Sequence, residues 1–562
     1  MADKTNPHSS IDPRTGFCPE TKIFHSLRPP VPLPPLSQPL SLTQYAFSLL
    51  QSSATDITKT TFLVDSSSDR RLTYAVFLRQ IHSLASSLKS STSLCKGQTA
   101  FVLCPPSLHV PVVYLALLSL GVTVCPANPL GSNSEVAHQV KLSQPAIAFT
   151  TSSTFHKLPG NLPLGTILVD SPEFLSMLDR FDLPDYNQSL IFRSTEINQT
   201  DPAAILFSSG TTGRVKGVLL THQNFIALIA GLFALRRDPD PNGEPEPHPV
   251  SLFILPLFHV FGFFMLVRAI SNGETLVLME RFDFEAMLRN VEKYKVTYMP
   301  VSPPLVVALA KSPVADKYDL SSLRLLGCGG APLGKEVVQS FNEKFPNVEI
   351  VQGYGLTETG GGASRMIEAE EAKVFASVGK LAENMEAKIV DPVTGEALPP
   401  GHKGELWLRG PTVMKGYVGD EKATAETLDS EGWLKTGDLC LFDSDGYLYI
   451  VDRLKELIKY KAYQVPPAEL EQLLQSHPDI ADAAVIPYPD EEAGQIPMAY
   501  VVRKPGSNIT EDRIIDYIAK QVAPYKKVRR VAFIQAIPKS PAGKILRREL
   551  VTHALSSGSS KL

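Results

Sequence analysis

The sequence predicts an α/β fold, in which a large N-terminal domain of α/β subdomains with a small β-barrel-like part precedes a small α+β C-terminal domain. From Leu42 onward, amphipathic segments alternate with short apolar runs, which is typical of largely parallel sheets covered by helices. Between residues 404 and 453 the pattern becomes turn-rich, and after Arg453 the density of charge rises. We therefore expect a domain boundary near residue 453 in this chain of 562 residues.

The N-terminal segment, residues 1–40, is rich in proline and serine, as in the run RPPVPLPPLSQPLS at positions 28–41. Proline fixes φ and has no amide hydrogen, so this composition favours an extended chain. We expect the segment to cross a surface without building a core. The large domain then occupies residues 41–452.

Short apolar runs predict the strands of the large domain, and the segments between them predict its helices. Two longer apolar stretches, 110–127 and 251–270, approach membrane-spanning length, but prolines and polar residues interrupt both. We interpret each as a buried helix followed by a strand and expect no transmembrane segment. The expected strands are residues 99–103, 166–169, 203–207, 217–221, 250–256, 274–280, 296–300, 323–330 and 348–355.

The C-terminal part of the sequence contains a turn-rich stretch and then a charged one. GELWLRG at 404–410 and GWLKTGDLCLFDSDGYLYIVDR at 432–453 predict antiparallel strands joined by Asp-Gly turns. Residues 453–555 predict a compact βαβ-like domain. Residues 556–562 predict a flexible tail that ends in Ser560-Lys561-Leu562, the address read by the peroxisomal import receptor. We expect the peroxisomal matrix as the location.

Composition excludes several classes of protein. There are 54 basic and 58 acidic residues, a formal net charge of -4, so no bulk attraction to nucleic acid or anionic lipid is expected. The six cysteines have neither CxxC spacing nor nearby histidines, which indicates neither a zinc site nor a disulfide framework. The N-terminus has no basic region followed by an apolar one, so secretion is not expected.

The stretch SSGTTGRVK, positions 208–216, is the first candidate site. Glycines let a backbone approach closely, successive amides and hydroxyls can surround phosphate oxygens, and a lysine adds charge. It lacks the GK[ST] ending of a P-loop, and GCGGAPLG at 327–334 has Pro332 in place of the third glycine of a dinucleotide fingerprint. A surface Ser/Gly linker is the alternative interpretation. The candidate phosphate-binding residues are Ser208, Ser209, Gly210, Thr211, Thr212 and Lys216.

Together with this stretch, five further motifs follow in order: QGYGLTE (352–358), ELWLRG (405–410), TGD (436–438), DRLKELIKYKAYQV (452–465) and PKSPAGKILRREL (538–550). In this order they closely resemble the adenylate-forming superfamily, and within it the plant 4-coumarate:CoA ligases and their peroxisomal relatives. The resemblance spans about residues 42–550. It implies a carboxylate:CoA ligase in which the acid attacks the α-phosphate of ATP, and CoA then displaces AMP from the acyl-AMP.

The resemblance implies roles for individual residues in binding ATP. The serine- and glycine-rich stretch would hold the β- and γ-phosphates, Glu358 would bind Mg²⁺, and Asp438 would accept the ribose hydroxyls beside Arg453. Lys455 would be the hinge that makes the small domain mobile. The remaining residues of the implied adenine and α-phosphate wall are Gly330, Gln352, Gly353, Tyr354 and Thr357.

It also implies the catalytic and CoA-binding residues. Lys544 would neutralise charge on the carboxylate and α-phosphate oxygens. His259 would orient the carboxylate or admit CoA, although a hydrogen-bonded core histidine is the alternative. The residues implied for contact with the adenylate are Lys459 and Gln464, and those implied for CoA are Arg281, Lys461 and Ala462.

The acyl pocket departs from the hydroxycinnamate pattern. Phe261 replaces a tyrosine, Met265 replaces a small polar residue, and Gly361 and Gly362 replace bulkier side chains. We expect one apolar wall and one roomy wall, which favours a bulky or aliphatic acyl group. Fatty acids, jasmonate precursors and hydroxycinnamates all remain candidate substrates. The alternatives to a ligase are a luciferase-like monooxygenase and a non-catalytic binder of acyl groups or nucleotides.

Overall fold

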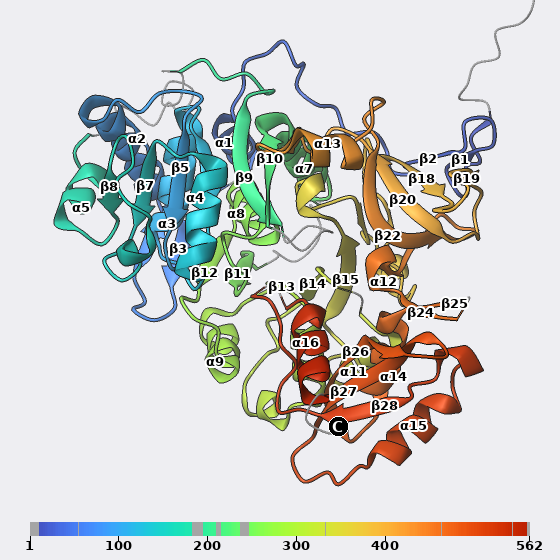
Figure 1. The fold of residues 1–562 in the computed structure, drawn as a ribbon. Coiled ribbons are helices and arrows are strands. Elements are labelled where there is room, and N and C mark those ends of the chain that lie inside the picture. Colours follow the sequence, from blue (N-terminus) through green and yellow to red (C-terminus); the bar gives the residue numbers. More distant parts are fainter. Residues whose placement is uncertain are drawn as a thin grey trace, which may run out of the picture.

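The computed structural model describes residues 10–53, 55–181, 195–208, 215–236, 247–331, 333–461, 463–541 and 543–558. Several predicted site residues lie outside these ranges: Ser209, Gly210, Thr211, Thr212, Ala462 and Ser560-Lys561-Leu562. The α/β fold class is confirmed (Figure 1). Each expected strand overlaps an observed one. Within the described ranges, no helix is long and apolar enough to cross a membrane.

The central sheet of the large domain has nine strands, in the order β17-β16-β15-β14-β13-β11-β12-β3-β4. Its six inner strands, from β15 to β3, run parallel, so their carboxyl ends meet at one edge. The strands are β17 (Lys380–Leu381), β16 (Ser364–Arg365), β15 (Glu349–Tyr354), β14 (Leu325–Cys328), β13 (Tyr298–Val301), β11 (Val250–Phe253), β12 (Thr275–Leu278), β3 (Thr61–Asp65) and β4 (Arg71–Thr73). The helices between them are α8 (Val260–Asn272), α9 (Phe284–Tyr294), α10 (Pro303–Lys311), α11 (Lys335–Lys344) and α12 (Ala369–Ala372).

A second sheet of seven strands has the order β21-β10-β9-β6-β5-β7-β8. One continuous apolar core joins it to the central sheet through helices that carry buried faces. The strands are β21 (Gly416–Tyr417), β10 (Lys216–Thr221), β9 (Pro202–Ser208), β6 (Thr123–Pro126), β5 (Thr99–Leu103), β7 (Ile147–Thr150) and β8 (Thr166–Leu168). The helices of this part are α1 (Leu42–Ser52), α2 (Tyr74–Ser91), α3 (His109–Ser119), α4 (Asn133–Ser143), α5 (Pro172–Leu178), α7 (His222–Ala234) and α13 (Glu421–Thr427).

The two long apolar stretches are buried, as expected, but their internal order differs. Stretch 110–127 forms helix α3 and then strand β6, whereas stretch 251–270 forms strand β11 first and helix α8 second. The expectation of a helix first is therefore wrong for the second stretch. The reason is local: β11 ends at Phe253, and the His259 side chain caps the N-terminus of α8 by accepting a hydrogen bond from the Phe261 amide at 3.3 Å.

The N-terminal segment builds part of a core, contrary to the expectation for residues 1–40. Phe17 and Phe24 are buried, and the Phe24 ring stacks on Phe442 with 4.4 Å between centroids. The expectation rested on residues 28–41 and overlooked these upstream aromatics. Both belong to an antiparallel sheet of β1 (Phe17–Cys18), β2 (Ile23–His25), β18 (Glu386–Val390), β20 (Gly404–Arg409), β22 (Leu434–Phe442) and β23 (Leu448–Arg453), with β19 (Ala397–Leu398) beside β18.

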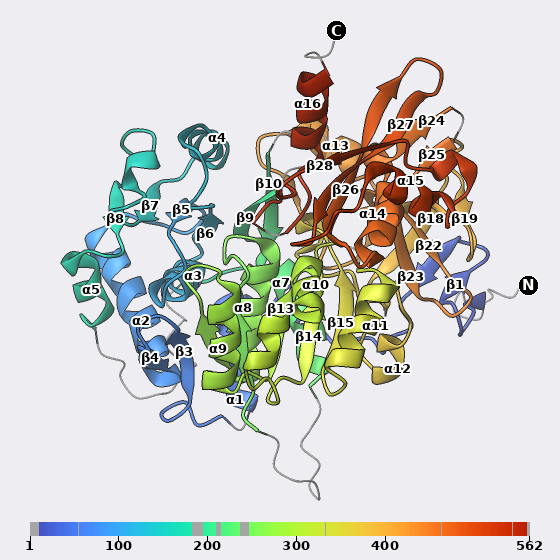
Figure 2. The same cartoon turned by 90° about the horizontal axis from the view of Figure 1, so that it is seen from below.

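The small domain forms a five-stranded sheet with helices and its own apolar core. It is coloured orange to red in Figures 1 and 2, where it lies at the end of the large domain at which β14 and β15 finish. The parallel pair β27 and β28, joined by α15, confirms the expected βαβ unit. Its elements are β24 (Ile458–Tyr460), β25 (Tyr463–Val465), α14 (Pro467–Ser476), β26 (Ile480–Asp490), β27 (Gly494–Arg503), α15 (Glu511–Ala519), β28 (Arg530–Phe533) and α16 (Arg547–Gly558).

Candidate active site

A cavity of about 570 Å³ lies between the carboxyl edge of the central sheet and the small domain. Open α/β sheets bind ligands at this edge, because the loops that leave the strands diverge there. Residues that follow β13, β14 and β15 form one wall, and residues of α14 and of the segment before α16 form the other. The predicted site residues that line it are Gly330, Gly353, Tyr354, Asp438, Arg453 and Lys544.

Asp438 is the buried anion of this cavity. The pairing of β22 with β23 places it opposite Arg453, whose Nε lies 3.1 Å from Oδ1. The Tyr354 hydroxyl donates a hydrogen bond to Oδ2 at 2.6 Å. Burial raises the pKa of Asp438, while the Arg453 guanidinium and the Tyr354 hydroxyl oppose that rise. A carboxylate held in this way can accept further hydrogen bonds from a neutral polyol such as ribose.

Lys544 reaches the same cavity from the loop before α16. The loop is a tight turn, in which the Lys544 amide donates to the Ser540 hydroxyl at 3.2 Å and the Ser540 amide donates to the Lys544 carbonyl at 2.8 Å. Gly543 has φ +81, and a Cβ there would lie 2.8 Å from the Ser302 hydroxyl, so glycine lets the loop approach the large domain. Burial, with the charge of Arg453, lowers the pKa of Lys544 to about 8. The side chain is therefore mostly a cation at pH 7.

A second group of predicted residues meets where β9 and β10 face each other. Ser208 ends β9 and pairs in register with Lys216, which begins β10. The Ser208 hydroxyl donates to Oε1 of Glu358 at 3.0 Å, and the Tyr417 hydroxyl donates to the same oxygen at 2.9 Å. The Lys216 ammonium lies 4.5 Å from the centroid of the Tyr417 ring. The fold thus joins Ser208, Lys216 and Glu358 at the two ends of the serine- and glycine-rich loop.

Sequence reasoning missed Tyr417. It lies in the short strand β21, beside β10, and no local motif distinguishes it from other buried tyrosines. Burial and the Glu358 carboxylate raise the pKa of Tyr417, so its hydroxyl remains a donor at neutral pH. It fixes one oxygen of Glu358, Oε1, which also accepts the hydrogen bond from Ser208.

Glu358 suits a divalent cation only in part. A hard carboxylate oxygen is a ligand that Mg²⁺ prefers. The described residues contain no group of three or more histidine, cysteine, aspartate or glutamate side chains that could hold a metal ion. Mg²⁺ would therefore need oxygen ligands from a bound substrate in addition to Glu358, and phosphate oxygens meet that need.

His259 is half-buried at the N-terminus of α8. Its Nδ1 accepts the Phe261 amide, which leaves the proton of the neutral ring on Nε2. Burial, together with the charge of Lys544, lowers the pKa of His259 to about 4. At neutral pH the ring is an uncharged donor through Nε2, and both of the roles considered for it, capping and substrate orientation, use that state.

Two glycines were predicted to form the roomy wall of the acyl pocket. A Cβ built on Gly361 would lie 2.4 Å from ring atoms of Phe264, and one on Gly362 would lie 2.7 Å from the Leu228 side chain. In the direction in which a side chain would point, these neighbours occupy the space beside both glycines. Phe264 stacks on Phe261 with 5.5 Å between ring centroids, and Met265 is buried in the same apolar core. The apolar character expected of the other wall agrees with these contacts.

The described residues predicted to contact CoA, and two of those predicted to contact the adenylate, do not line the cavity. Lys459 and Gln464 face each other across the β24–β25 hairpin, and both are exposed. Lys461, in the hairpin turn, has φ +51 and forms an ion pair with Glu492 at 2.7 Å. Arg281 is exposed in the loop between β12 and α9. In this arrangement of the two domains, Lys544 contacts the cavity and the hairpin does not.

The remaining predicted residues lie next to residues that line the cavity. Gln352 is buried on β15, next to the lining residue Gly353, and Thr357 is buried in the single turn Thr357–Thr359 that carries Glu358. Lys455 lies in the short 3-10 turn Leu454–Glu456 that joins the domains. The residue predicted to be the hinge therefore lies at the junction of β23 with the small domain.

Arg547 is a further cavity residue that sequence reasoning did not single out. It is half-buried and forms ion pairs with Glu471 of α14 and Glu456 of the junction. The charges of these partners raise its pKa further. The pairs attach the loop that carries Lys544 to the body of the small domain.

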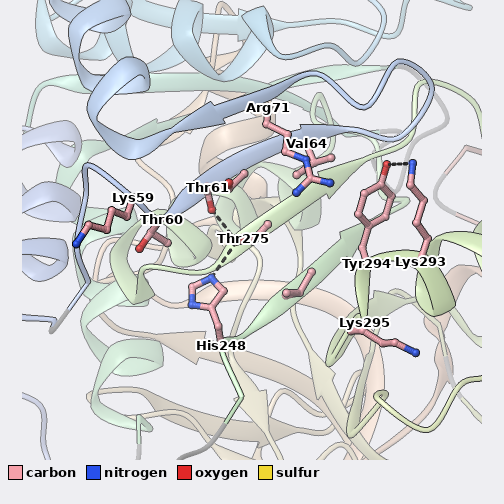
Figure 3. Close-up of a pocket in the computed structure, with 11 residues that line it drawn as sticks. Lys59, Thr60, Thr61, Val64, Arg71, His248, Thr275, Lys293, Tyr294 and Lys295 are labelled. Carbon is pink, nitrogen blue, oxygen red and sulfur yellow. Dashed lines mark hydrogen bonds between the residues drawn. The ribbon is translucent and has the colours of Figure 1, made fainter.

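A second cavity, of about 550 Å³, lies at the opposite, amino-terminal edge of the central sheet (Figure 3). Figure 3 shows Arg71, His248 and Tyr294 around it, and none of the predicted site residues lines it. Its cations face carboxylates: Arg71 pairs with Asp69 at 3.2 Å and Lys295 with Asp319 at 2.9 Å. Because local carboxylates balance these charges, the cavity does not compete with the first one as the active site.

The sequence matches the AMP-binding enzyme family over residues 50–418 and the AMP-binding enzyme C-terminal domain over residues 469–544. The chain belongs to the AMP-binding enzyme family. It is 62% identical to 4-coumarate–CoA ligase-like 9 of Arabidopsis thaliana over 570 residues, which cover 100% of each chain. It is 44% identical to peroxisomal OPC-8:0-CoA ligase 1 of the same plant, over 98% of this chain and 99% of that one.

Solved structures of this AMP-binding family share the fold. Among them is o-succinylbenzoate CoA synthetase from Bacillus subtilis in complex with its acyl-adenylate intermediate, with a TM-score of 0.73 and 26% identity over 90% of this chain and 97% of that one. As a member of the AMP-binding family, the chain is an adenylate-forming acid–thiol ligase that uses a carboxylic acid, ATP and CoA. This confirms the resemblance inferred from the motifs.

Proposed function

We propose that the protein activates an aliphatic or cyclopentenone carboxylic acid as its acyl-AMP and transfers the acyl group to CoA. The observation that carries the proposal is the cluster of Asp438, Tyr354, Arg453 and Lys544 in one cavity at the carboxyl edge of the sheet. An acceptor for a ribose and a partly desolvated cation lie there together, as an adenylating site requires.

In the first step a carboxylate oxygen attacks the α-phosphorus of ATP, and the bond to pyrophosphate breaks. Lys544 stabilises the negative charge on the carboxylate and α-phosphate oxygens as that bond forms. Asp438 orients the ribose, while Ser208 and Lys216 lie at the two ends of the loop proposed to hold the β- and γ-phosphates. In the second step the CoA sulfur attacks the acyl carbon, loses its proton and releases AMP.

Glu358 is the proposed protein ligand of Mg²⁺, with phosphate oxygens completing its coordination. The ion supplies positive charge to the triphosphate when it is bound. Tyr417 and Ser208 orient the Glu358 carboxylate through one oxygen. The hydrogen bond from Ser208 supports this proposal, because Ser208 lies at one end of the loop proposed to bind phosphate.

The class of acid follows from the apolar packing at Phe261, Phe264 and Met265, and from the relative named as an OPC-8:0-CoA ligase. We expect dodecanoate or OPC-8:0 to release pyrophosphate faster than 4-coumarate does, with one thioester formed per ATP consumed. A screen of the three acids with MgATP and CoA measures both quantities. Turnover of 4-coumarate alone would contradict the proposed acid class, and adenylate without thioester would favour a luciferase-like monooxygenase.

The proposed location is the peroxisomal matrix, through recognition of Ser560-Lys561-Leu562 by the import receptor. Deleting these three residues should turn the punctate signal of an N-terminal fluorescent fusion into a cytosolic one. Specific activity should not change, because the buried side chains of α16 nearest the C-terminus, Leu550 and Ala554, lie upstream. Puncta that persist after the deletion would contradict this location.

A further inference from the structure

Lys311, the last residue of α10, connects the large domain to the small one. Its ammonium donates hydrogen bonds to the carbonyl of Gln475 at 2.7 Å and to that of Ile480 at 3.1 Å. Both acceptors belong to the small domain, at the end of α14 and the start of β26. The last carbonyls of a helix have no partners within it and carry partial negative charge, so they suit a cation.

The side chain is half-buried at this interface and lines the cavity described above. Burial lowers the pKa of Lys311 to about 8; the neighbouring Lys504 contributes to the decrease, and Asp482 opposes it. Asp482 is also bound by Lys539 of the small domain. The ammonium is thus directed at the two carbonyls.

The other end of α14 is also held by the large domain. Oδ2 of Asp452, on β23, accepts the Ala468 amide in the first turn of the helix at 2.9 Å. A carboxylate at the N-terminus and an ammonium at the C-terminus both match the polarity of the helix dipole. Asp452 lies three residues before Lys455, at the junction of the two domains, whereas Lys311 belongs to α10 of the large domain.

The position of α14 determines the position of Lys544. Glu471 of α14 forms the ion pair with Arg547, three residues after Lys544, and so joins the helix to the catalytic loop. Any rotation that moves the β24–β25 hairpin to the cavity must break both bonds from Lys311. These bonds therefore belong to the arrangement in which Lys544 reaches the cavity.

We propose that Lys311 is a positioning residue for acyl-AMP formation, which docks the C-terminal end of α14 so that Lys544 enters the active site. The inference rests on the proposed two-step function. It assigns to Lys311 no contact with ATP, acid or CoA, and its effect is confined to the first half-reaction.

The test compares Lys311→Met with Lys344→Met. Lys344 is a matched control, because it donates to the Ser312 carbonyl at 2.7 Å and pairs with Asp316 at 3.0 Å, both within the large domain. Loss of two charge-assisted hydrogen bonds should slow acyl-AMP formation by about tenfold in Lys311→Met. Thioester formation from supplied acyl-AMP should be unchanged or faster. Lys311→Arg keeps a cation and its hydrogen-bond donors, so it should retain most of the wild-type rate of acyl-AMP formation.

The measurements are pyrophosphate release with MgATP and the fastest acid among dodecanoate, OPC-8:0 and 4-coumarate, and CoA-dependent consumption of the matching acyl-AMP. Thermal unfolding of each variant identifies any that fails to fold. Equal loss of both half-reactions in Lys311→Met, or the same loss of the first in Lys344→Met, would overturn the inference. Wild-type protein that forms no acyl-AMP from any of the acids would instead overturn the proposed function.

Discussion

Lys544→Ala should slow acyl-AMP formation by about a hundredfold or more and leave a supplied acyl-AMP able to react with CoA. Removing a preorganised charge from a transition state costs on the order of 3 kcal/mol, which corresponds to about that factor in rate. The Lys544 ammonium is partly desolvated beside Arg453 and Asp438, where its charge acts strongly. Thioester formation does not need this charge at the same position. Rapid-quench measurement of each half-reaction gives both rates.

The pH dependence tests whether the cation itself acts. With a pKa of about 8 in the free protein, Lys544 is protonated below that pH and loses its proton above it. The kcat/KM of acyl-AMP formation, which reports the free enzyme, should therefore fall as the pH rises through about 8. Lys544→Arg keeps its charge throughout and should show a smaller decrease, and the part that remains is due to Lys311, whose pKa is also about 8. A decrease in Lys544→Arg as large as that of the wild type, or equal loss of both half-reactions in Lys544→Ala, would exclude the proposed role.

Asp438→Asn should raise the KM for ATP by about a hundredfold. The substitution keeps the size of the side chain but removes the charge that would accept two ribose hydroxyls, and charge-assisted hydrogen bonds contribute about 1.5–3 kcal/mol each. It also leaves the Arg453 guanidinium half-buried without its counter-ion. Breaking a buried pair from one side costs about 3 kcal/mol or more of stability. Titration with ATP and urea unfolding measure the two effects separately.

Tyr354→Phe is the matched control at the same carboxylate. It removes the one hydrogen bond from the Tyr354 hydroxyl and retains both the ring and the Asp438–Arg453 pair. We expect less than a tenfold rise in the KM for ATP. A larger effect of Tyr354→Phe than of Asp438→Asn would show that Asp438 serves mainly as a structural partner of Arg453.

The sequence predicted most of the cavity because its residues lie at the ends of strands that apolar periodicity reveals. Gly330, Gly353 and Tyr354 end or follow β14 and β15, and parallel strands bring their carboxyl ends to one edge. Asp438 and Arg453 lie in a hairpin whose Asp-Gly turn is visible in the sequence. Strand ends and turns are determined by residues that are close together in the chain, so local sequence patterns predict them.

Other features of the site depend on contacts between residues that lie far apart in the chain, and sequence analysis did not predict these contacts. The space beside Gly361 was predicted to be open, yet Phe264 of another helix occupies it. Arg547 was not singled out from its charged run, yet it forms an ion pair with Glu471 of α14. In both cases the sequence gives the residue at a position, but it does not say which residues from distant parts of the chain pack against it.

The sequence by itself determined the fold class, the family and the residues of the adenylating motifs, because these are set by periodicity and by the order of short segments. Only the tertiary structure decided which side chains meet: Tyr417 with Glu358, Phe264 with Gly361, and Lys311 with the end of α14. Their partners lie far apart in the chain, so the contacts exist only after the sheets and the two domains have packed. The packing and electrostatic energies of such contacts depend on the distance between the residues in space. Separation along the chain does not specify that distance.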